Sequence, residues 1–554
     1  MTDRRLKVIA FALACVLYIA VGYWLQVQNG FILGDALSRV SAAQAVLFSR
    51  DPHLAAIGFI FTPLTAMLQI PAVLLSPLWP DLTERAFAGS LMTAVFMAGC
   101  VVQVLSMGTD RKLPRGYIVA VTALFALNPM IVFYGSNGMS EAPFLFFITW
   151  AVRRLIMWMV DDDVHHLIAA GGVAMALSYL TRYDAVACIF TAGIVVAVTT
   201  FLRARKPPRL RRAVLDLVLV SGPGLASFVG WAATSWLITG EPFAQFTSQY
   251  GNAAILQQSG TQAVDFGGGL VFAATCTMLM TPTLIPIALW AGVIRLRRPY
   301  WPTLVVPFAL YGAVLGFQFY SYASGSTFAF LRFYIAAIPF AACLAMLAVP
   351  ERGYVAAKRP GRFAPAAVEP RRQRGWPAYV PVALVFAVTV PATAWAMSLP
   401  TYAPQEYALG AVLAPDPDDV SDRKAVERRI AATFSTEREI AQYLDDLDLP
   451  ESAVITDTVY GFAVVAASQR PKTFVVPSDP DFATLLNDPV GQGVEYLLAV
   501  PPTGRGVSDA LNVRYPTLYD TGADIATLEL EIPNDGDGQP TWRLYRVNGG
   551  VPES

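Results

Sequence analysis

Long apolar runs separated by short polar turns recur through residues 1–399. They cover residues 8–27, 86–107, 116–133, 142–160, 164–180, 185–202, 213–238, 268–292, 302–319, 332–349 and 379–398. Each run is close to the ~20 residues that a helix needs to cross the ~30 Å hydrocarbon core of a bilayer. The pattern therefore predicts a polytopic α-helical membrane protein with about eleven transmembrane helices.

One further apolar stretch, residues 57–79, predicts something else. It contains Pro63, Pro71 and Pro77, and a proline inside a helix removes a backbone donor and bends or breaks the helix. We therefore expect a broken or surface-lying segment at this point and not a crossing. The first outer loop then extends over residues 28–85.

The residues after the last apolar run follow a different pattern. Residues 400–435 are polar and predict a linker. Residues 436–554 alternate short apolar runs with helix-like segments, which is typical of a small α/β domain. We expect strands at 453–455, 473–476, 496–500, 525–532 and 542–547, and helices at 437–447, 461–468 and 508–513.

The distribution of basic residues sets the expected orientation. Arg4, Arg5 and Lys7 keep the N-terminus in the cytoplasm under the positive-inside rule. Further basic clusters follow the second, sixth, eighth and tenth runs, within residues 111–115, 203–212, 295–298 and 352–374. With eleven crossings all of these clusters lie in the cytoplasm, and the C-terminal α/β domain is extracytoplasmic. Since no N-glycosylation sequon is present, we expect a multi-pass protein of a bacterial plasma membrane.

The composition agrees with this class of protein. Of 554 residues, 55% are hydrophobic and 15% are charged, whereas soluble domains carry about 25% charged residues. The formal net charge of −1 gives no sign of a nucleic-acid partner, because the basic residues form short clusters between apolar runs. All five cysteines lie inside apolar runs, which argues against a disulfide framework and against a cysteine-based metal site.

The main candidate for a catalytic residue is Asp35, which lies shortly after the first apolar run. It opens an amphipathic stretch, residues 35–49, that suits a helix lying along the membrane surface. Arg39 is four residues further on and meets Asp35 on the same helical side. Asp35 is then either a carboxylate that removes a proton from a substrate or an ordinary N-cap with a surface pair to Arg39.

Other charged residues are expected at the same membrane face. Glu141 opens the fourth run, where a helix N-terminus also favours an acid for structural reasons. Arg182 and Asp184, on either side of Tyr183, lie between two apolar runs, as either a functional site or a mutual anchor. Arg332 opens a run against the positive-inside bias, so it either binds a phosphate or extends toward the interface.

Three other motifs predict only local structure. Asp161–Asp163 with His165 and His166 predict a solvated helix end in the cytoplasm. Asp416-Pro417-Asp418 lies in the linker and predicts a turn. Residues 534–538 lack the trailing glutamate of a calcium loop and predict a hairpin turn. No cofactor follows from the sequence; a divalent metal is compatible with it but not indicated.

In their order and common side, these features resemble the GT-C superfamily of membrane glycosyltransferases. They are most similar to the branch of family 39 with lipid A aminoarabinose transferase and the protein O-mannosyltransferases. The segments that carry the resemblance are Asp35, Ser49–His53, Phe61–Leu64, Ser140–Pro143, Leu180–Arg182 and Arg332–Tyr334 with Pro339. The resemblance implies a GT-C transmembrane catalytic domain over residues 1–399, followed by the linker 400–435 and the external α/β domain 436–554.

The resemblance also implies a function. An inverting transferase would move a hexosyl or pentosyl group from a polyprenyl-phosphate donor to a cell-envelope glycan, lipid or protein on the outer face. Asp35 would be the general base. The donor phosphate would bind Arg39, Arg182, Arg332 and Tyr334. The residues expected to orient acceptor or sugar are Glu141, His53, Asp51, Tyr183 and Asp184.

Two positions depart from the family pattern. Ala36 stands where relatives often have a second acid, which argues against a carboxylate pair and against metal dependence there. Thr62 stands where lipid A transferases have a lysine, so the phosphate contact must come from arginines. One alternative is a lipid or sugar transporter, for which the sequence shows neither charges or broken helices at mid-membrane nor paired repeats. The other is a non-catalytic envelope scaffold.

Overall fold

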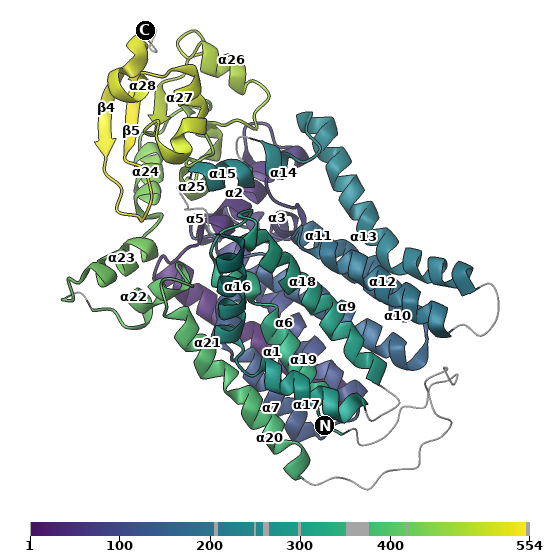
Figure 1. The fold of residues 1–554 in the computed structure, drawn as a ribbon. Coiled ribbons are helices and arrows are strands. Elements are labelled where there is room, and N and C mark those ends of the chain that lie inside the picture. The colour runs from purple at the N-terminus through teal and green to yellow at the C-terminus, as the bar shows by residue number, and fades with distance from the viewer. Residues whose placement is uncertain are drawn as a thin grey trace.

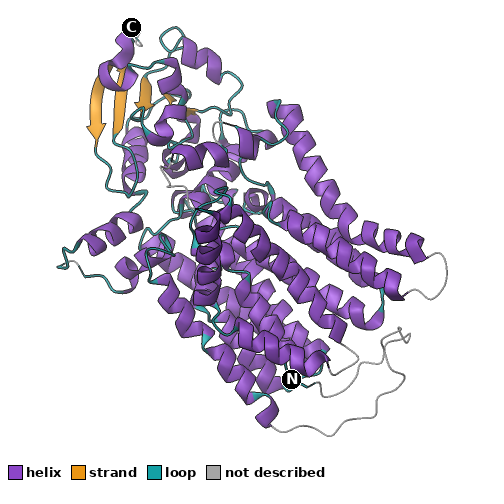
Figure 2. Cartoon of the chain, viewed as in Figure 1, coloured by secondary structure: helices purple, strands orange, loops and turns teal. Residues whose placement is uncertain are grey.

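The computed structural model describes residues 2–203, 209–248, 251–258, 265–296, 301–350, 376–416 and 418–549. A bundle of long helices carries a smaller α/β domain at one end (Figure 1). Helices dominate, and the strands are confined to the C-terminal domain (Figure 2). The N-terminus lies at the opposite end of the bundle (Figure 1). Parts of the basic clusters, including all of 352–374, lie outside the described residues.

Eight helices among the described residues are long and apolar enough to cross a membrane. They are α1 with its continuing π-helical turn (Asp3–Gln28), α6 (Phe87–Asp110), α9 (Glu141–Asp161), the helix α10 to α11 (Val164–Thr181), α12 (Ala185–Arg203), α13 (Arg209–Thr239), α18 (Val305–Ala323), and α20 with α21 (Val380–Met397). They correspond to eight of the eleven predicted runs. Many of their apolar side chains are exposed, as lipid-facing positions require.

The other three runs are helical but less regular. The third run is interrupted at Asn128-Pro129, which divides it into α7 (Arg115–Ala126) and α8 (Pro129–Tyr134). The tenth run forms a 3-10 turn (Leu331–Tyr334) and the short helix α19 (Ala337–Leu347). The eighth run is broken into α16 (Phe266–Met280) and α17 (Leu284–Leu296), bent by 76° around Pro282. A broken helix was not expected from the sequence.

The segment after the first helix is irregular, as its prolines predict. α2 (Gly34–Phe48) lies across the end of the bundle that carries the α/β domain. It is followed by the short helices α3 (Leu64–Met67), α4 (Ile70–Val73) and α5 (Asp81–Glu84). Residues 57–79 therefore contain no crossing helix.

The C-terminal domain is built on a five-stranded sheet of order β2-β1-β3-β5-β4. β1 (Val454–Ile455), β2 (Phe474–Val475) and β3 (Tyr496–Ala499) are parallel, and β4 (Ala526–Ile532) and β5 (Trp542–Val547) form an antiparallel pair. α24 (Ser435–Asp446), α25 (Phe462–Ala467), α26 (Phe482–Asn487) and α27 (Ala510–Arg514) surround the sheet. Each strand and helix predicted for this domain is present. Residues 400–435, predicted as a linker, carry α22 (Gly410–Leu413) and α23 (Asp422–Ala431).

The α/β domain docks on the first loop through an apolar contact and an ion pair. α25 packs against α2, with Ala463 and Ala466 in one buried cluster with Leu37 and Val40. Arg50 donates to both carboxylate oxygens of Asp481, at 2.9 and 2.7 Å, and to Asp479 at 3.3 Å. Two donors directed at one carboxylate fix the domain's rotation as well as its position.

We expect Arg50→Ala to loosen this docking without unfolding either part. A bidentate, partly exposed pair contributes about 1 kcal/mol, so amide exchange in residues 474–487 should become about fivefold faster. Hydrogen–deuterium exchange with mass spectrometry measures the rates. Arg470→Ala is the matched control, because its pair with Asp448 lies within the domain. Unchanged exchange in Arg50→Ala would mean that the apolar contact alone holds the domain.

Candidate active site at the end of the bundle

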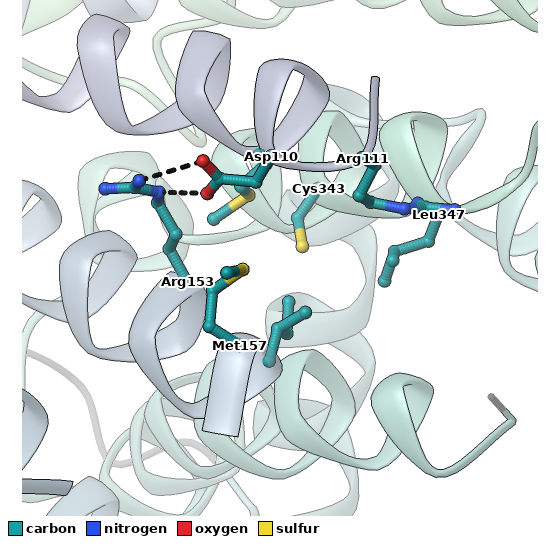
Figure 3. Close-up of a pocket in the computed structure, with 8 residues that line it drawn as sticks. Asp110, Arg111, Arg153, Met157, Cys343 and Leu347 are labelled. Carbon is teal, nitrogen blue, oxygen red and sulfur yellow. Dashed lines mark hydrogen bonds and ion pairs between the residues drawn. The ribbon is translucent and has the colours of Figure 1, made fainter. Parts of the chain in front are cut away.

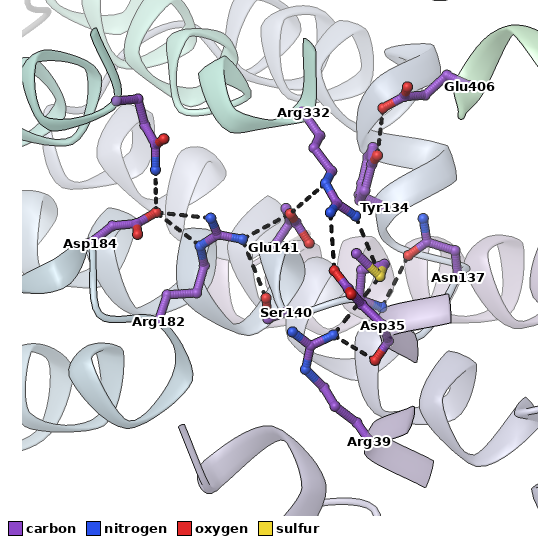
Figure 4. A network of polar contacts seen from close by, with 12 residues as sticks. Asp35, Arg39, Tyr134, Asn137, Ser140, Glu141, Arg182, Asp184, Arg332 and Glu406 are labelled. Carbon is purple, nitrogen blue, oxygen red and sulfur yellow. Dashed lines mark hydrogen bonds and ion pairs between the residues drawn. The ribbon is translucent and has the colours of Figure 1, made fainter. Parts of the chain in front are cut away.

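The site is centred on Asp35 in the first turn of α2. Its carboxylate is not an N-cap, because Leu33 occupies that position and no side chain caps the helix. Asp35 Oδ2 instead accepts a hydrogen bond from Arg332 Nη2 at 3.0 Å (Figure 4). Arg332 is buried, with 6% of its side chain exposed, whereas 40% of the Asp35 side chain is exposed. Asp35 is therefore the accessible end of this ion pair.

A chain of ion pairs continues from Arg332 into the bundle. The nearest pair of Arg332 with Glu141 is Nε to Oε1 at 3.9 Å. Glu141 also accepts from Arg182 Nη1 at 2.9 Å, and Arg182 donates from Nε and Nη2 to Asp184 Oδ2 at 3.0 and 2.9 Å. Gln318 Nε2 donates to the same oxygen at 2.6 Å. Residues from α2, α9, α11, α18 and the turn before α19 thus form one network (Figure 4).

Aromatic rings flank the arginines of this network. Arg332 lies over Phe330, 4.8 Å from the ring centroid, and Arg182 lies between Phe144 and Phe333 at 5.7 and 5.6 Å. The face of a ring attracts a cation most strongly where water is excluded. These contacts help to keep two guanidinium groups charged in a buried place.

Arg39 differs from the other two arginines. Its Nη1 donates to the backbone carbonyl of Asp35 at 2.8 Å, and its guanidinium lies 4.2 Å above the ring of Phe61. Among the described residues no carboxylate forms an ion pair with it. The predicted meeting of Asp35 and Arg39 therefore occurs through the main chain, which leaves the Arg39 guanidinium near the Asp35 carboxylate but not paired with it.

Several residues of the site were not predicted from the sequence, among them Gln318, Tyr134 and Glu406. Tyr134 donates its hydroxyl to Glu406 Oε1 at 2.5 Å, and both side chains are buried next to Arg332. Tyr134 sits at the end of an apolar run, and Glu406 lies in the stretch predicted as a linker. No spacing or motif in the sequence marks either residue, because their proximity depends on how α8 and the residues after α21 pack.

Several predicted site residues lie outside the network. His53 Nδ1 donates a hydrogen bond to the Asp51 carbonyl at 2.6 Å, and both side chains are partly exposed in the first loop. Tyr183 packs edge-on against Phe246, and Tyr334 against Phe319, each without a hydrogen bond to its hydroxyl among the described contacts. The geometry gives these four residues no direct role in the ion-pair network.

Five buried polar atoms of the site have no hydrogen-bond partner within the described residues. They are Asn137 Nδ2, Glu141 Oε2, Asp184 Oδ1, Arg332 Nε and Glu406 Oε2. Buried polar atoms in proteins are nearly always bonded, and the exceptions concentrate where a ligand or water binds. Their concentration around Arg332 and Glu141 makes this network a candidate ligand site.

The position next to Asp35 is tightly packed. Ala36 is fully buried, and a Cβ on Gly138 would lie only 3.1 Å from the Ala36 Cβ. Gly138 also approaches Gly89 closely, since a Cβ on Gly89 would be 2.9 Å from the Gly138 Cα. The loop before α9 therefore passes directly over Ala36.

Charge determines the protonation of Asp35. Burial by itself would raise the pKa of this carboxyl, but the nearby positive charges of Arg332 and Arg39 and the hydrogen bond from Arg332 outweigh it. The pKa of Asp35 consequently lies below its usual value, and the group is a carboxylate at neutral pH.

A second polar cluster lies toward the end of the bundle that holds the N-terminus. Arg153 donates to both oxygens of Asp110, at 2.6 and 3.1 Å, beside a small cavity lined by Met157 and Cys343 (Figure 3). Asp163 caps α10 by accepting from the His165 amide, as a helix end predicts. No group of three or more His, Cys, Asp or Glu side chains in the described part of the chain converges to hold a metal ion.

This arrangement of helices, with a surface helix after the first span and an α/β domain at the same end, is the GT-C fold of membrane glycosyltransferases. The structure is similar to that of ArnT, a lipid A aminoarabinose transferase, from Cupriavidus metallidurans bound to undecaprenyl phosphate. The TM-score is 0.56 at 13% identity, and 99% of each chain is covered. The apo form of the same ArnT gives a TM-score of 0.56 at 14% identity, again over 99% of each chain.

No protein-family model matches the sequence, and no curated protein matches it either. At such low identity the structural likeness establishes the fold alone. It confirms the predicted GT-C architecture of a multi-pass helical protein with a C-terminal α/β domain. The chemistry of the chain has to be argued from its own residues.

We expect Arg182→Gln to destabilise the protein strongly. The change leaves Glu141 and Asp184 buried without their shared cation, which costs about 3 kcal/mol or more. The apparent melting temperature of the purified protein in detergent should fall clearly, as followed by tryptophan fluorescence. Arg470→Gln breaks an exposed pair and should change it little. Equal melting temperatures for both variants would show that the network is not a structural element.

Proposed function

We propose that this chain is an inverting glycosyltransferase that moves a sugar from a polyprenyl-phosphate donor to a cell-envelope acceptor. The observation that carries the proposal is the ion pair between Asp35 and Arg332. It places an accessible carboxylate and two buried guanidinium groups, those of Arg332 and Arg39, within one small region. An acid that accepts a proton beside cations that bind phosphate is the requirement for this reaction.

Asp35 is the general base in the proposed reaction. It takes the proton of the acceptor hydroxyl while the acceptor oxygen attacks the anomeric carbon. The bond between that carbon and the phosphate oxygen breaks as the new bond forms on the opposite face, which inverts the configuration. The leaving polyprenyl phosphate keeps the bonding electrons, and Arg39 and Arg332 stabilise its added negative charge.

The phosphate also activates the base. In the structure Arg332 lowers the pKa of Asp35 and so weakens it as a proton acceptor. A donor phosphate at Arg332 competes with Asp35 for the same guanidinium nitrogens. Loss of that contact raises the pKa of Asp35, and the carboxylate becomes a stronger base only when the donor is bound.

The remaining network residues act as positioning groups in this scheme. Glu141 and Asp184 hold Arg182, and Glu141 also lies beside Arg332. Tyr134 and Glu406 are hydrogen-bonded to each other on the other side of Arg332. Arg182 is fully engaged with carboxylates, so Arg39 and Arg332 are the better candidates for the donor phosphate. Tyr334, His53, Asp51 and Tyr183 remain proposals for contacts that the donor or acceptor makes when bound.

The proposed orientation follows the positive-inside rule. The N-terminus lies in the cytoplasm, and the site and the α/β domain lie outside. Residues 1–399 form the catalytic domain and residues 436–554 the external domain, which receives or covers an acceptor glycan, lipid or protein.

One structural feature favours the alternative of a transporter, namely the break between α16 and α17. However, residues 266–294 contain no charged side chain that could coordinate a transported ion or sugar phosphate.

We expect Asp35→Asn to reduce sugar transfer by about 100-fold or more, because the amide cannot accept the proton. In the assay, membranes that contain the protein are incubated with radiolabelled polyprenyl-phosphate sugars as donors and with envelope lipids and glycans as acceptors. The transfer of label to the acceptors is then measured. Asp446→Asn, an exposed acid of α24, is the matched control. Full transfer by Asp35→Asn would overturn the assignment of the base, and no transfer from any donor by the wild type would overturn the class of enzyme.

We expect Arg332→Gln to move the acid limb of the pH–rate profile to higher pH. Arg332 keeps the pKa of Asp35 low, so the base loses its charge only at low pH in the wild type. Without Arg332 that pKa rises, and activity is lost earlier as the pH falls. The dependence of kcat/KM on pH reports the free enzyme. An unshifted acid limb would show that Asp35 does not limit the rate, and Arg546→Gln on the exposed face of β5 is the control.

A further inference from the structure

Two arginines outside the network converge where the first loop meets the α/β domain. Arg85 ends α5, and Arg438 lies in the first turn of α24. Both guanidinium groups approach Gly30: a Cβ there would lie 3.3 Å from Arg438 Nη2 and 3.4 Å from Arg85 Nη1. Gly30 has a φ of +67°, so the position favours glycine and leaves room for both side chains. We call Arg85 and Arg438 the arginine pair.

Neither member of the arginine pair has an ion-pair partner among the described residues. Arg438 Nη1 is buried and donates no hydrogen bond within the described residues. Glu437 is adjacent in sequence, but its Oε1 already accepts from Asn534 and Trp542 at 2.7 and 3.0 Å. At the same interface Arg50 is fully paired with Asp479 and Asp481. At this interface one arginine is therefore paired with carboxylates, and the other two form no ion pair within the described residues.

A pair of like charges without a direct ion-pair partner destabilises the folded protein. Burial and the charge of Arg85 lower the pKa of Arg438 to about 10, so the group is still charged at neutral pH. The N-terminus of α24 adds a further positive partial charge. Removal of a buried cation from water is offset only by an anion or by hydrogen bonds. The nearby carboxylates of Glu437, Glu84 and Glu439 offset part of the Arg438 charge. None of them forms an ion pair with it, and its buried Nη1 donates no hydrogen bond within the described residues, which points to an anion supplied by a ligand.

The exposed residues near the arginine pair indicate where that anion lies. Leu74, Leu75, Leu78 and Trp79, just before α5, are all exposed, from 41% for Trp79 to 86% for Leu78. Exposed leucines with a tryptophan are typical of a segment inserted at the level of the lipid headgroups. Gly30 itself lies two residues beyond the end of the first membrane helix at Gln28. The arginine pair therefore lies at the level of the lipid headgroups.

We propose that Arg85 and Arg438 bind the phosphate headgroup of an anionic phospholipid, which bridges the first loop and the α/β domain. Guanidinium groups suit this ligand because their fork of donors matches phosphate oxygens. The site is separate from the network around Asp35, since no ion pair joins the two within the described chain. It holds a lipid that is not consumed, and it does not depend on the proposed transfer reaction.

The test measures lipid binding without any sugar donor. Native mass spectrometry counts phosphatidylglycerol and phosphatidylcholine adducts on the detergent-purified full chain, and tryptophan fluorescence gives its melting temperature with each lipid or with inorganic phosphate. The variants are Arg85→Gln, Arg438→Gln and the double variant. Arg546→Gln, which removes an exposed arginine of the same domain, is the matched control.

Phosphatidylglycerol should bind the wild type and raise its melting temperature, and the double variant should bind it at least tenfold more weakly. Without lipid the double variant should melt no lower than the wild type, because neither arginine forms an ion pair within the described residues and the two like charges repel each other. Equal binding by the wild type and the double variant would overturn the proposal. Stabilisation by inorganic phosphate but not by phosphatidylglycerol would overturn the assignment of a lipid.

Discussion

Three buried arginine charges at one end of the helical bundle constrain the structure around them. Arg182 and Arg332 are compensated by carboxylates from helices far apart in sequence, whereas Arg39 rests on an aromatic ring and a backbone carbonyl. In a low-dielectric environment such charges tolerate little displacement, because each loss of contact exposes an uncompensated ion. The ends of α2, α9, α11 and α19 are thus fixed relative to one another by electrostatics as well as by packing.

The α/β domain extends this constraint to the surface helix. α25 covers the apolar side of α2, and Arg50 fixes the orientation of the domain, so the helix that carries Asp35 is held between the bundle and the sheet. In the reaction proposed above, this packing would couple acceptor binding at the α/β domain to the geometry of Asp35. These contacts join the two parts of the chain, although their cores are separate.

Much of this architecture could be predicted from the sequence, for physical reasons. Hydrophobic length marks membrane helices reliably, and alternation of apolar runs identified each strand of the sheet. The charges at Asp35, Glu141, Arg182 and Arg332 were visible because ionisable residues beside apolar runs are rare. The contact of Tyr134 with Glu406 and the bend at Pro282 were not predictable, since both depend on tertiary packing. Which arginine stays unpaired is likewise a property of the folded chain alone.

The close passage of the Gly138 loop over Ala36 limits how this site could change. A second acid beside Asp35 would need space that the Gly89, Gly138 and Ala36 contacts occupy. A carboxylate pair could therefore arise only if the loop moved in the same step, which would also displace Glu141 three residues further on. A single substitution is enough to remove the acid at position 35. A second acid at position 36, by contrast, would require a change in the loop at the same time.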